Sequence, residues 1–146
     1  MDRTDDRTEE LAERLRAAIG TLVRIGRGRA DTLSPAHAAT LGHLDREGPM
    51  TTADLARRRG VRHQGQSRTV IELEALGHVV RTASATDARA SVIGITEAGR
   101  LALTADRRAR TSWMARAIDA ELDPDERAAL ERMPELLARI AQHTDG

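Results

Sequence analysis

The sequence of 146 residues contains no cysteine, lysine, phenylalanine or tyrosine, and only one tryptophan. Without cysteine, the chain cannot form disulfides, bind a metal ion through thiolates or sense redox state through a thiol. Without most of the aromatic residues, nearly all of its apolar mass comes from Leu, Ala, Ile and Val. A core of this kind is marginal in a short chain, so the burial of further apolar surface between two chains would supplement it.

The sequence also has no long apolar run. No stretch reaches transmembrane length, and the first ten residues, MDRTDDRTEE, lack the apolar region of a signal peptide. We therefore expect a cytoplasmic protein that forms one compact domain, or one core with helical extensions.

Signals of catalysis and of metal binding are scarce. The five histidines include no pair spaced by four residues, so a zinc site would have to be assembled across the fold. There is no glycine-rich phosphate loop, no Ser-His-Asp pattern with supporting context and no paired-carboxylate signal above background. We therefore expect no enzyme, no cofactor and no bound metal ion.

The basic residues are all arginine, and 23 of them balance 23 acidic residues. Exclusive use of arginine is typical of a GC-rich genome, so the position of the arginines matters more than their number. Residues 1–50 and 101–146 carry net charges of −1 and −2, whereas residues 51–100 carry +3. A basic middle between acidic ends indicates a module that binds a polyanion.

Helical spacing of apolar residues and capping motifs predict about six helices. The expected helices cover residues 8–25, 35–47, 51–60, 64–76, 97–122 and a final stretch that begins at 123–124. Gly26 and Gly28 are expected to end the first helix, and Ser34-Pro35 to begin the second. Pro134 should kink or interrupt the last helix, because proline removes a backbone donor and clashes with the preceding turn.

The middle of the chain has the pattern of a helix-turn-helix followed by a hairpin. The helices at 51–60 and 64–76 are short and are joined by only a few residues, as in a helix-turn-helix. Thr51 is expected to cap the first of them. The period then changes to that of β-strands, and the runs 79–83 and 91–96 predict a hairpin with a long polar tip.

The helix at 64–76 is expected to have two distinct faces. At 100° per residue, Val70, Leu73 and Leu76 mark the side that faces the core. The opposite side carries an amide, a hydroxyl and a guanidinium in the first two turns, from Gln64, Ser67 and Arg68. Glutamine can bond adenine, arginine can bond guanine, and serine can bond either. The alternative is an ordinary solvated polar face.

Arginines also flank the turn between the two helices. Arg57, Arg58 and Arg59 point in three directions, so they cannot all touch one ligand surface. We expect one or two of them to contact phosphate and the others to be solvated or to offset the helix dipole. The residues expected to contact phosphate are Thr51, Arg58, Arg62 and His63.

Three segments, ADLARRRGV, QSRTVIELEALGHVVR and DARASVIGITEAGR, resemble the MarR-type (multiple-antibiotic-resistance regulator) transcription factors of bacteria. The last segment is the most specific. The wing of this family is marked by Asp-x-Arg, a strand that ends in Leu-Thr and a glycine three residues later. The matching residues here, with isoleucine for leucine, are Asp87, Arg89, Ile95, Thr96 and Gly99. The resemblance covers residues 34–100 closely and the flanking helices in arrangement.

The resemblance implies a mainly helical fold with a winged helix-turn-helix lobe at residues 34–99. Residues 1–33 and 100–146 would form the dimerisation helices. It further implies a homodimer on a pseudo-palindromic operator in double-stranded DNA, usually as a repressor that a small anionic or phenolic ligand can release.

The resemblance also implies roles for single residues. Gln64, Ser67 and Arg68 would read the major groove, in agreement with the face assigned to them above. Arg89 would enter the minor groove and Asp87 would hold it in place, since a narrow minor groove attracts arginine.

By family analogy, a ligand pocket would lie between the dimerisation helices and the DNA-binding lobe. Arg16 and His37 would supply polar contacts there, and Trp113 would form a wall. The alternative for Trp113 is packing in the core of the dimer.

The sequence departs from the family pattern at several positions. Arg62 stands where many members have a capping Ser or Thr, and Gly65 should cost its helix about 1 kcal/mol against alanine. Gln66 stands where an apolar residue is common, and it could bond locally or turn towards DNA. The departures at Gly65 and Gln66 support one alternative, a winged-helix module that binds proteins or small molecules without gripping specific DNA. A second alternative is an architectural protein that binds DNA without sequence preference.

Overall fold

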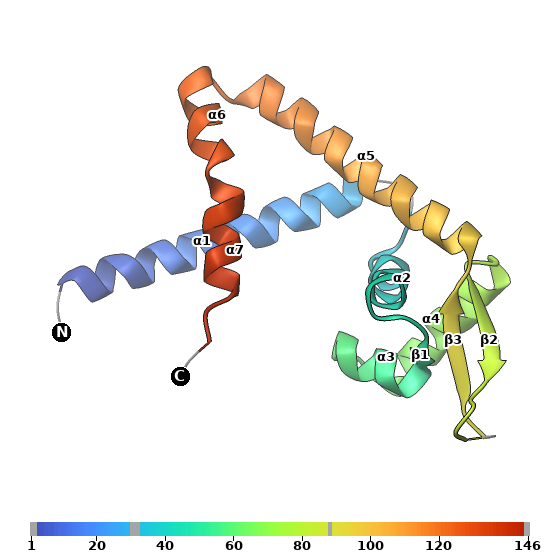
Figure 1. Ribbon diagram of the computed structural model, residues 1–146. Helices are drawn as coiled ribbons and strands as arrows, with labels where there is room; N and C mark the ends of the chain where they lie inside the picture. Colours follow the sequence, from blue (N-terminus) through green and yellow to red (C-terminus); the bar gives the residue numbers. More distant parts are fainter. Residues whose placement is uncertain (1–2, 30–32, 88, 145–146) are drawn as a thin grey trace. The chain divides into compact units, whose positions relative to one another are not determined.

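The computed structural model describes residues 3–29, 33–87 and 89–144, with side chains from residue 6 onward. The chain divides into two compact units, 1–110 and 111–146. The helices in the described residues are α1 (Arg3–Arg29), α2 (Pro35–Glu47), α3 (Thr52–Arg59), α4 (His63–Ala75), α5 (Glu97–Glu121), α6 (Pro124–Glu131) and α7 (Met133–Ala141) (Figure 1). The strands are β1 (Met50–Thr51), β2 (Val79–Ala83) and β3 (Ser91–Ile95). The expected mainly helical fold with a β-hairpin is therefore confirmed.

Side-chain caps begin three of the helices where the sequence predicts them. The Ser34 hydroxyl accepts a hydrogen bond from the backbone N–H of His37 at 3.2 Å, at the start of α2. The Thr51 hydroxyl does the same at the start of α3. Asp123 and Glu126 form a reciprocal capping box at the start of α6. Each cap satisfies backbone donors that the first turn of a helix leaves free.

The prediction that Gly26 and Gly28 end the first helix is wrong, because α1 continues through both to Arg29. Glycine ends a helix when its backbone turns left-handed. Among the described residues, a positive φ occurs only at Gly48, Gly60 and Gly77. Gly26 and Gly28 therefore only weaken the last turn of α1.

The expected interruption at Pro134 is confirmed, and it divides the last predicted helix into α6 and α7. The break falls at Arg132, and Pro134 occupies the first turn of α7, where its missing N–H costs no hydrogen bond. This break accounts for the seventh helix.

The sheet contains one strand that the periodicity did not predict. β1 pairs antiparallel with β3, which also pairs with β2, so the order is β1-β3-β2. Met50 lies opposite Ile93, and Val79 lies opposite Ile95. A two-residue strand is too short for an alternating pattern, so only its partner in the fold reveals it.

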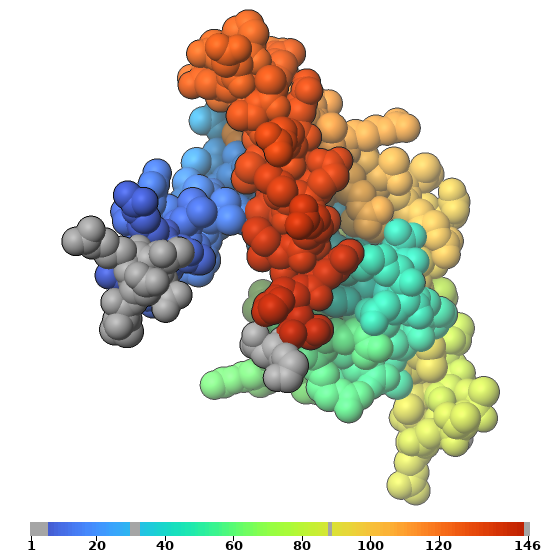
Figure 2. Space-filling model, turned by 60° about the vertical axis from the view of Figure 1, so that its left-hand side comes forward, coloured from blue at the N-terminus to red at the C-terminus, as the bar shows by residue number. Residues whose placement is uncertain are grey.

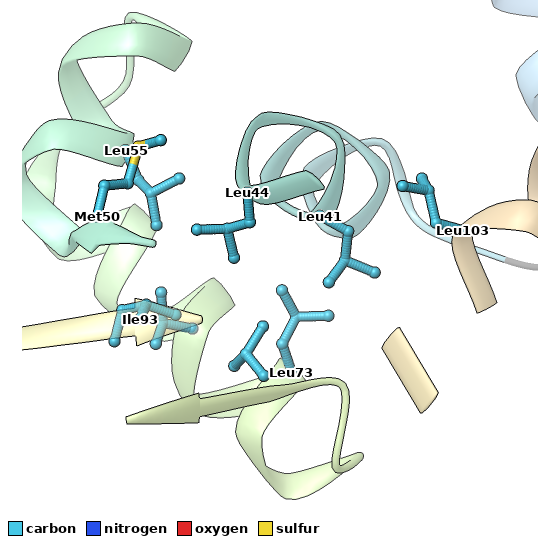
Figure 3. Packing of buried hydrophobic residues seen from close by; sticks show 9 residues of the cluster. Leu41, Leu44, Met50, Leu55, Leu73, Ile93 and Leu103 are labelled. Carbon is cyan, nitrogen blue, oxygen red and sulfur yellow. The ribbon is translucent and has the colours of Figure 1, made fainter. Parts of the chain in front are cut away.

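The apolar core of the first unit lies among α2, α3, α4 and β3. Figure 3 shows Leu41 and Leu44 of α2 projecting into the space that Leu73 of α4 and Ile93 of β3 occupy. Each fully buried leucine contributes about 1.5–3 kcal/mol of transfer free energy. Leu76 is an exception: the expectation that it faces the core is wrong, because its side chain is 57% exposed. Leu76 is the C-cap of α4, where the chain leaves the helix.

The Thr-x-x-Gly segment after β3 has a packing role. The Thr96 hydroxyl donates to the carbonyl of Gly77 at 2.6 Å and accepts from the N–H of Gly99 at 3.0 Å. A Cβ atom at Gly99 would collide with the carbonyl oxygen of His78. Only glycine therefore allows α5 to start this close to the turn that follows α4.

The second unit contains the end of α5, α6 and α7. Its helices leave large apolar side chains exposed in the single chain: Met114, Leu130, Leu136 and Ile140. Neither α6 nor α7 contains a buried residue. The described residues include no helix that is long and apolar enough to span a membrane.

Candidate nucleic-acid interface

The turn between α3 and α4 is built by a left-handed glycine. Gly60 has φ 63° and ψ 34°, and its N–H bonds the last carbonyls of α3. Arg62 is the N-cap of α4, and its side chain makes no capping bond. The helix starts at His63, one residue before the predicted start, so the lack of a capping Ser or Thr does not prevent it.

The outward face of α4 carries the polar groups that the sequence assigns to it. Gln64 and Arg68 are exposed, and Ser67 is half-buried. Ile71, one turn further along the same face, is 60% exposed. The helical angle of Ile71 places it on this face in the sequence. No role was predicted for it, because a single apolar residue lacks the hydrogen-bonding groups that marked the other positions.

Gln66 lies on the inward face, where it is fully buried. Its side-chain N–H donates to the Thr40 hydroxyl of α2 at 3.1 Å, and its carbonyl oxygen accepts from the guanidinium of Arg59 of α3. Of the two alternatives for Gln66, the structure therefore selects bonding within the protein. One amide joins α2, α3 and α4, and its burial is compensated by both bonds.

The three arginines at the end of α3 diverge, as predicted. Arg57 pairs with Asp54 on its own helix. Arg58 reaches the carboxylate of Glu47 at the end of α2, with 2.8 Å between Nε and Oε1. Arg59 turns inward to Gln66. Arg57 and Arg58 therefore remain on the surface, and Arg59 belongs to the structural network.

A depression of about 300 Å³ lies where the beginning of α3, the beginning of α4 and the hairpin come together. It is lined by polar and small residues from all three segments: Thr51, Thr52, Ala53, His63, Ser67, Arg81, Arg89, Ala90 and Ser91. Four of these, at positions 51, 63, 67 and 89, were singled out from the sequence. Arg81 was not, because only the pairing of β2 with β3 brings it to this place.

In the described part of the hairpin tip, side chains hold the backbone on both sides of Asp87 through hydrogen bonds. The Asp87 carboxylate accepts a hydrogen bond from the backbone N–H of Arg89 at 3.0 Å, and the Ser84 hydroxyl accepts from the N–H of Asp87. Asp87 thus fixes the backbone from which the Arg89 side chain extends. Figure 2 shows the hairpin, in yellow-green, projecting beyond the helices of the same unit.

Two carboxylates on this surface are held ionised by basic partners. Hydrogen bonds from Arg58 and then from His43 lower the pKa of Glu47. The hydrogen bond from His37 is the largest cause that lowers the pKa of Glu72, and Arg68 adds to it. Arg68, on the outward face of α4, is therefore paired with a carboxylate in the free chain, at 3.2 Å between Nε and Oε1.

The residues expected to line a ligand pocket have partners of their own or lie in the other unit. His37 bonds Glu72 at 2.9 Å, and the exposed side chain of Arg16 bonds Glu13 on the same helix. Trp113 is half-buried in the second unit. Within the described part of the chain, no three His, Cys, Asp or Glu side chains gather in a way that could hold a metal ion.

Comparison with known proteins agrees with this geometry. Residues 31–90 match the MarR family. An HTH-type transcriptional regulator of Mycobacterium bovis is 30% identical over 141 residues, which are 95% of this chain and 98% of that protein. The crystal structure of a transcriptional regulator from Pseudomonas aeruginosa superposes with a TM-score of 0.82 at 32% identity, over 96% of this chain and 99% of the other.

The chain therefore belongs to the MarR family: it is a transcriptional regulator with a DNA-binding winged helix, and not an enzyme. The resemblance inferred from the sequence is confirmed. A more distant structure, an S. aureus MepR variant bound to an oligodeoxyribonucleotide, has the same fold with a TM-score of 0.64 at 18% identity, over 89% of this chain and 97% of that one.

Proposed function

We propose that this regulator acts in the cytoplasm as a homodimeric repressor that binds a pseudo-palindromic operator in double-stranded DNA. One observation carries the proposal: His63 and Ser67 of α4, the start of α3 and the arginine-bearing hairpin line a single depression. This arrangement suits a duplex whose major groove receives α4 while its backbone and minor groove meet the flanking elements.

Base reading is assigned to the outward face of α4. The amide of Gln64, the hydroxyl of Ser67 and the guanidinium of Arg68 supply the donors and acceptors that base edges require. To these we add Ile71, whose exposed apolar side chain suits the methyl group of thymine. The inward bonds of Gln66 exclude it from this set.

Phosphate contacts are assigned to the residues around the turn and the depression. Thr51 and His63 line the depression, and Arg62 is exposed beside them. Arg58 can contact phosphate if its guanidinium leaves the carboxylate of Glu47, since both side chains of this pair are partly exposed. Arg81 joins this set because it lines the same depression.

The hairpin is assigned to the minor groove. Arg89 would insert there, because a narrow minor groove concentrates negative potential. Asp87 would contribute through the backbone, which its carboxylate fixes at Arg89.

Dimerisation is assigned to residues 1–33 and 100–146, and DNA binding to residues 34–99. α1 exposes a row of apolar side chains in the single chain: Leu11, Ile19, Leu22, Val23 and Ile25. α7 carries Leu136 and Ile140 on one stripe, four residues apart. Apolar surface of this extent on helices is typical of an interface between subunits. The two α4 helices of a dimer should then lie about 34 Å apart.

Release by a small anionic or phenolic ligand completes the proposal. Arg16, His37 and Trp113 remain the candidates for its pocket. Of these candidates, His37 offers the most direct route to the DNA-binding face, because its bond to Glu72 links α2 to α4, the proposed reading helix.

Two observations favour the proposal over the alternative of a winged-helix module without specific DNA binding. That alternative depended on Gly65 and Gln66. Gln66 now has a structural role, and Gly65 lies within α4 without breaking the helix.

A fluorescence anisotropy titration tests the proposal. The purified chain is titrated onto a duplex from its own upstream intergenic region and onto a random duplex of equal length, at several salt concentrations. We expect tighter binding to the upstream duplex and a log–log salt slope of about −0.9 for each phosphate neutralised. Equal affinity for both duplexes near physiological salt would overturn the proposal, and a steep slope with equal affinity would identify an architectural DNA-binding protein.

A further inference from the structure

Arg68 is attached to its own helix by only part of its guanidinium. Its Nε–H donates to Glu72 Oε1 at 3.2 Å, and its side chain is 84% exposed. Within the described part of the chain, neither terminal amino group of Arg68 has a partner. A guanidinium held at Nε offers those two groups as a fork, which matches the O6 and N7 acceptors of guanine.

Glu72 is itself held from the other side. Its second oxygen, Oε2, bonds Nε2 of His37 at 2.9 Å. His37 lies on α2, and its side chain is only 14% exposed. One carboxylate is therefore shared, one oxygen each, between a half-buried side chain of the core helix α2 and the exposed arginine of the reading helix. Its lowered pKa keeps it ionised near neutral pH.

We propose that Glu72 is a positioning residue for DNA recognition: anchored by His37, it holds Arg68 at Nε so that the terminal amino groups of Arg68 face a guanine in the major groove. This inference rests on the proposed function, because it assigns a mode of reading to the same face of α4. Glu72 does not touch the base. It limits the many rotamers that a free arginine would otherwise populate.

The proposal has an unusual consequence, because Glu72 is a negative charge on a surface that faces phosphate. Replacing it with glutamine removes that repulsion, so binding to random DNA should become tighter. At the same time, Arg68 keeps at most a neutral amide as its partner in place of a carboxylate, so its orientation is fixed less tightly and discrimination at its base pair should fall. Loss of a residue that merely supports the fold would not raise the affinity for random DNA while lowering discrimination at one base pair.

The experiment uses the full chain and the duplex selected by it from random DNA. The base pair read by Arg68 is first located as the one at which Arg68→Ala loses discrimination, with 7-deazaguanine as a probe of N7. Discrimination at that base pair is then measured for the wild type, Glu72→Gln, Arg68→Ala and the double variant. We expect Glu72→Gln to lower discrimination at that base pair by at least about threefold in the wild type. In the Arg68→Ala background, the same change should leave discrimination unaltered.

Glu74→Gln is the matched control. Glu74 lies on the same helix and pairs with Arg81, with 3.4 Å between Oε2 and Nη2. Its removal deletes the same charge, so random DNA should again bind more tightly, but discrimination at the base pair of Arg68 should stay at the wild-type value. Thermal unfolding of each variant without DNA verifies that the fold is intact.

The contradicting outcomes are separable. If the wild type selects no sequence, or no base pair depends on Arg68, both the proposed reading and the role of Glu72 fail. If the wild type discriminates but Glu72→Gln keeps that discrimination, only the positioning role is overturned. The positioning role is also overturned if Glu72→Gln acts equally without Arg68, or if Glu74→Gln has the same effect.

Discussion

At the scale of single residues, the arginines of the helix-turn-helix make different contacts although they lie within a dozen positions of one another. Arg59 is committed to the Gln66 network, Arg58 is bonded to Glu47, and Arg68 leaves its terminal amino groups exposed. The chain uses arginine everywhere, so the number of arginines did not identify the reading residue. Position on a helical face predicts Arg68 for this role, and the contacts distinguish it from Arg58 and Arg59.

Arg68→Ala and Arg58→Ala should therefore differ in kind. Loss of a bidentate base contact should cost Arg68→Ala about 1–3 kcal/mol on the operator and relax the preference at one base pair. Arg58→Ala should weaken operator and random DNA by similar factors and make the salt slope shallower. Competition binding with single-base operator variants measures both. Identical profiles for the two variants would show that the outward face of α4 is misassigned.

Ile71 gives a test that does not depend on charge. If its side chain contacts a thymine methyl group, operator duplexes with deoxyuridine in place of thymidine should bind more weakly at one position. Ile71→Ala should be insensitive to the same replacement. A wild-type protein that binds every uridine-substituted duplex like the parent would remove Ile71 from the reading face.

At the scale of elements, the DNA-binding lobe is held together by a few contacts between helices. The Gln66 amide joins three helices, and the turn at Thr96 and Gly99 fits the hairpin to α5. These contacts place the reading face, so their loss should affect stability before it affects any contact to DNA.

Gly99→Ala should destabilise the free protein strongly, because the new methyl group collides with the carbonyl oxygen of His78. We expect a loss of about 2 kcal/mol or more in the free energy of unfolding. Gly65→Ala is the control: nothing lies within 4 Å of its Cβ position, so the change should stabilise α4 by about 1 kcal/mol. Urea unfolding measures both, and a neutral Gly99→Ala would show that α5 does not require a glycine there.

The links from α2 to α3 and to α4 should make stability depend on pH in the acid range. The pKa values of Glu47 and Glu72 are lowered in the folded chain, by bonds from Arg58 and from His37 respectively. A lowered pKa in the folded state stabilises the chain above the unfolded pKa of about 4.3, and this stabilisation is lost as pH falls through the folded pKa.

The urea midpoint of the wild type should thus fall between about pH 5 and pH 3 by more than that of a Glu47→Gln, Glu72→Gln double variant. Both groups are exposed, so the difference should be small. Parallel midpoint curves for the two proteins would show that these carboxylates do not contribute to acid sensitivity.

At the scale of the whole molecule, the local elements could be predicted from the sequence, whereas the long-range contacts could not. Ser34, Thr51 and Asp123 cap helices through neighbouring residues, so their signals lie within a few positions of the chain. β1, the place of Arg81 and the bond between Glu72 and His37 depend on segments that meet only in the fold. The end of α1 was placed too early because glycine signals a helix end only when its backbone turns left-handed.

The exposed apolar stripe on α7 predicts that the protein is a dimer in solution. Sedimentation equilibrium should give twice the chain mass of 15.9 kDa. Ile140→Asp should shift the mass towards the monomer and weaken operator binding, since a half-site alone lacks the second reading helix. Val80→Asp, at another exposed apolar residue, should leave the mass unchanged. A monomeric wild type would contradict the dimer.

Selection of bound sequences from random DNA tests the central claim most directly, because it examines reading and symmetry in one measurement. Recognition by two α4 helices predicts an enriched pseudo-palindrome whose half-site centres lie about 10 base pairs apart, roughly one helical turn. Recovery of unenriched DNA, or of a single unpaired half-site, would contradict the account of a dimeric, sequence-specific regulator.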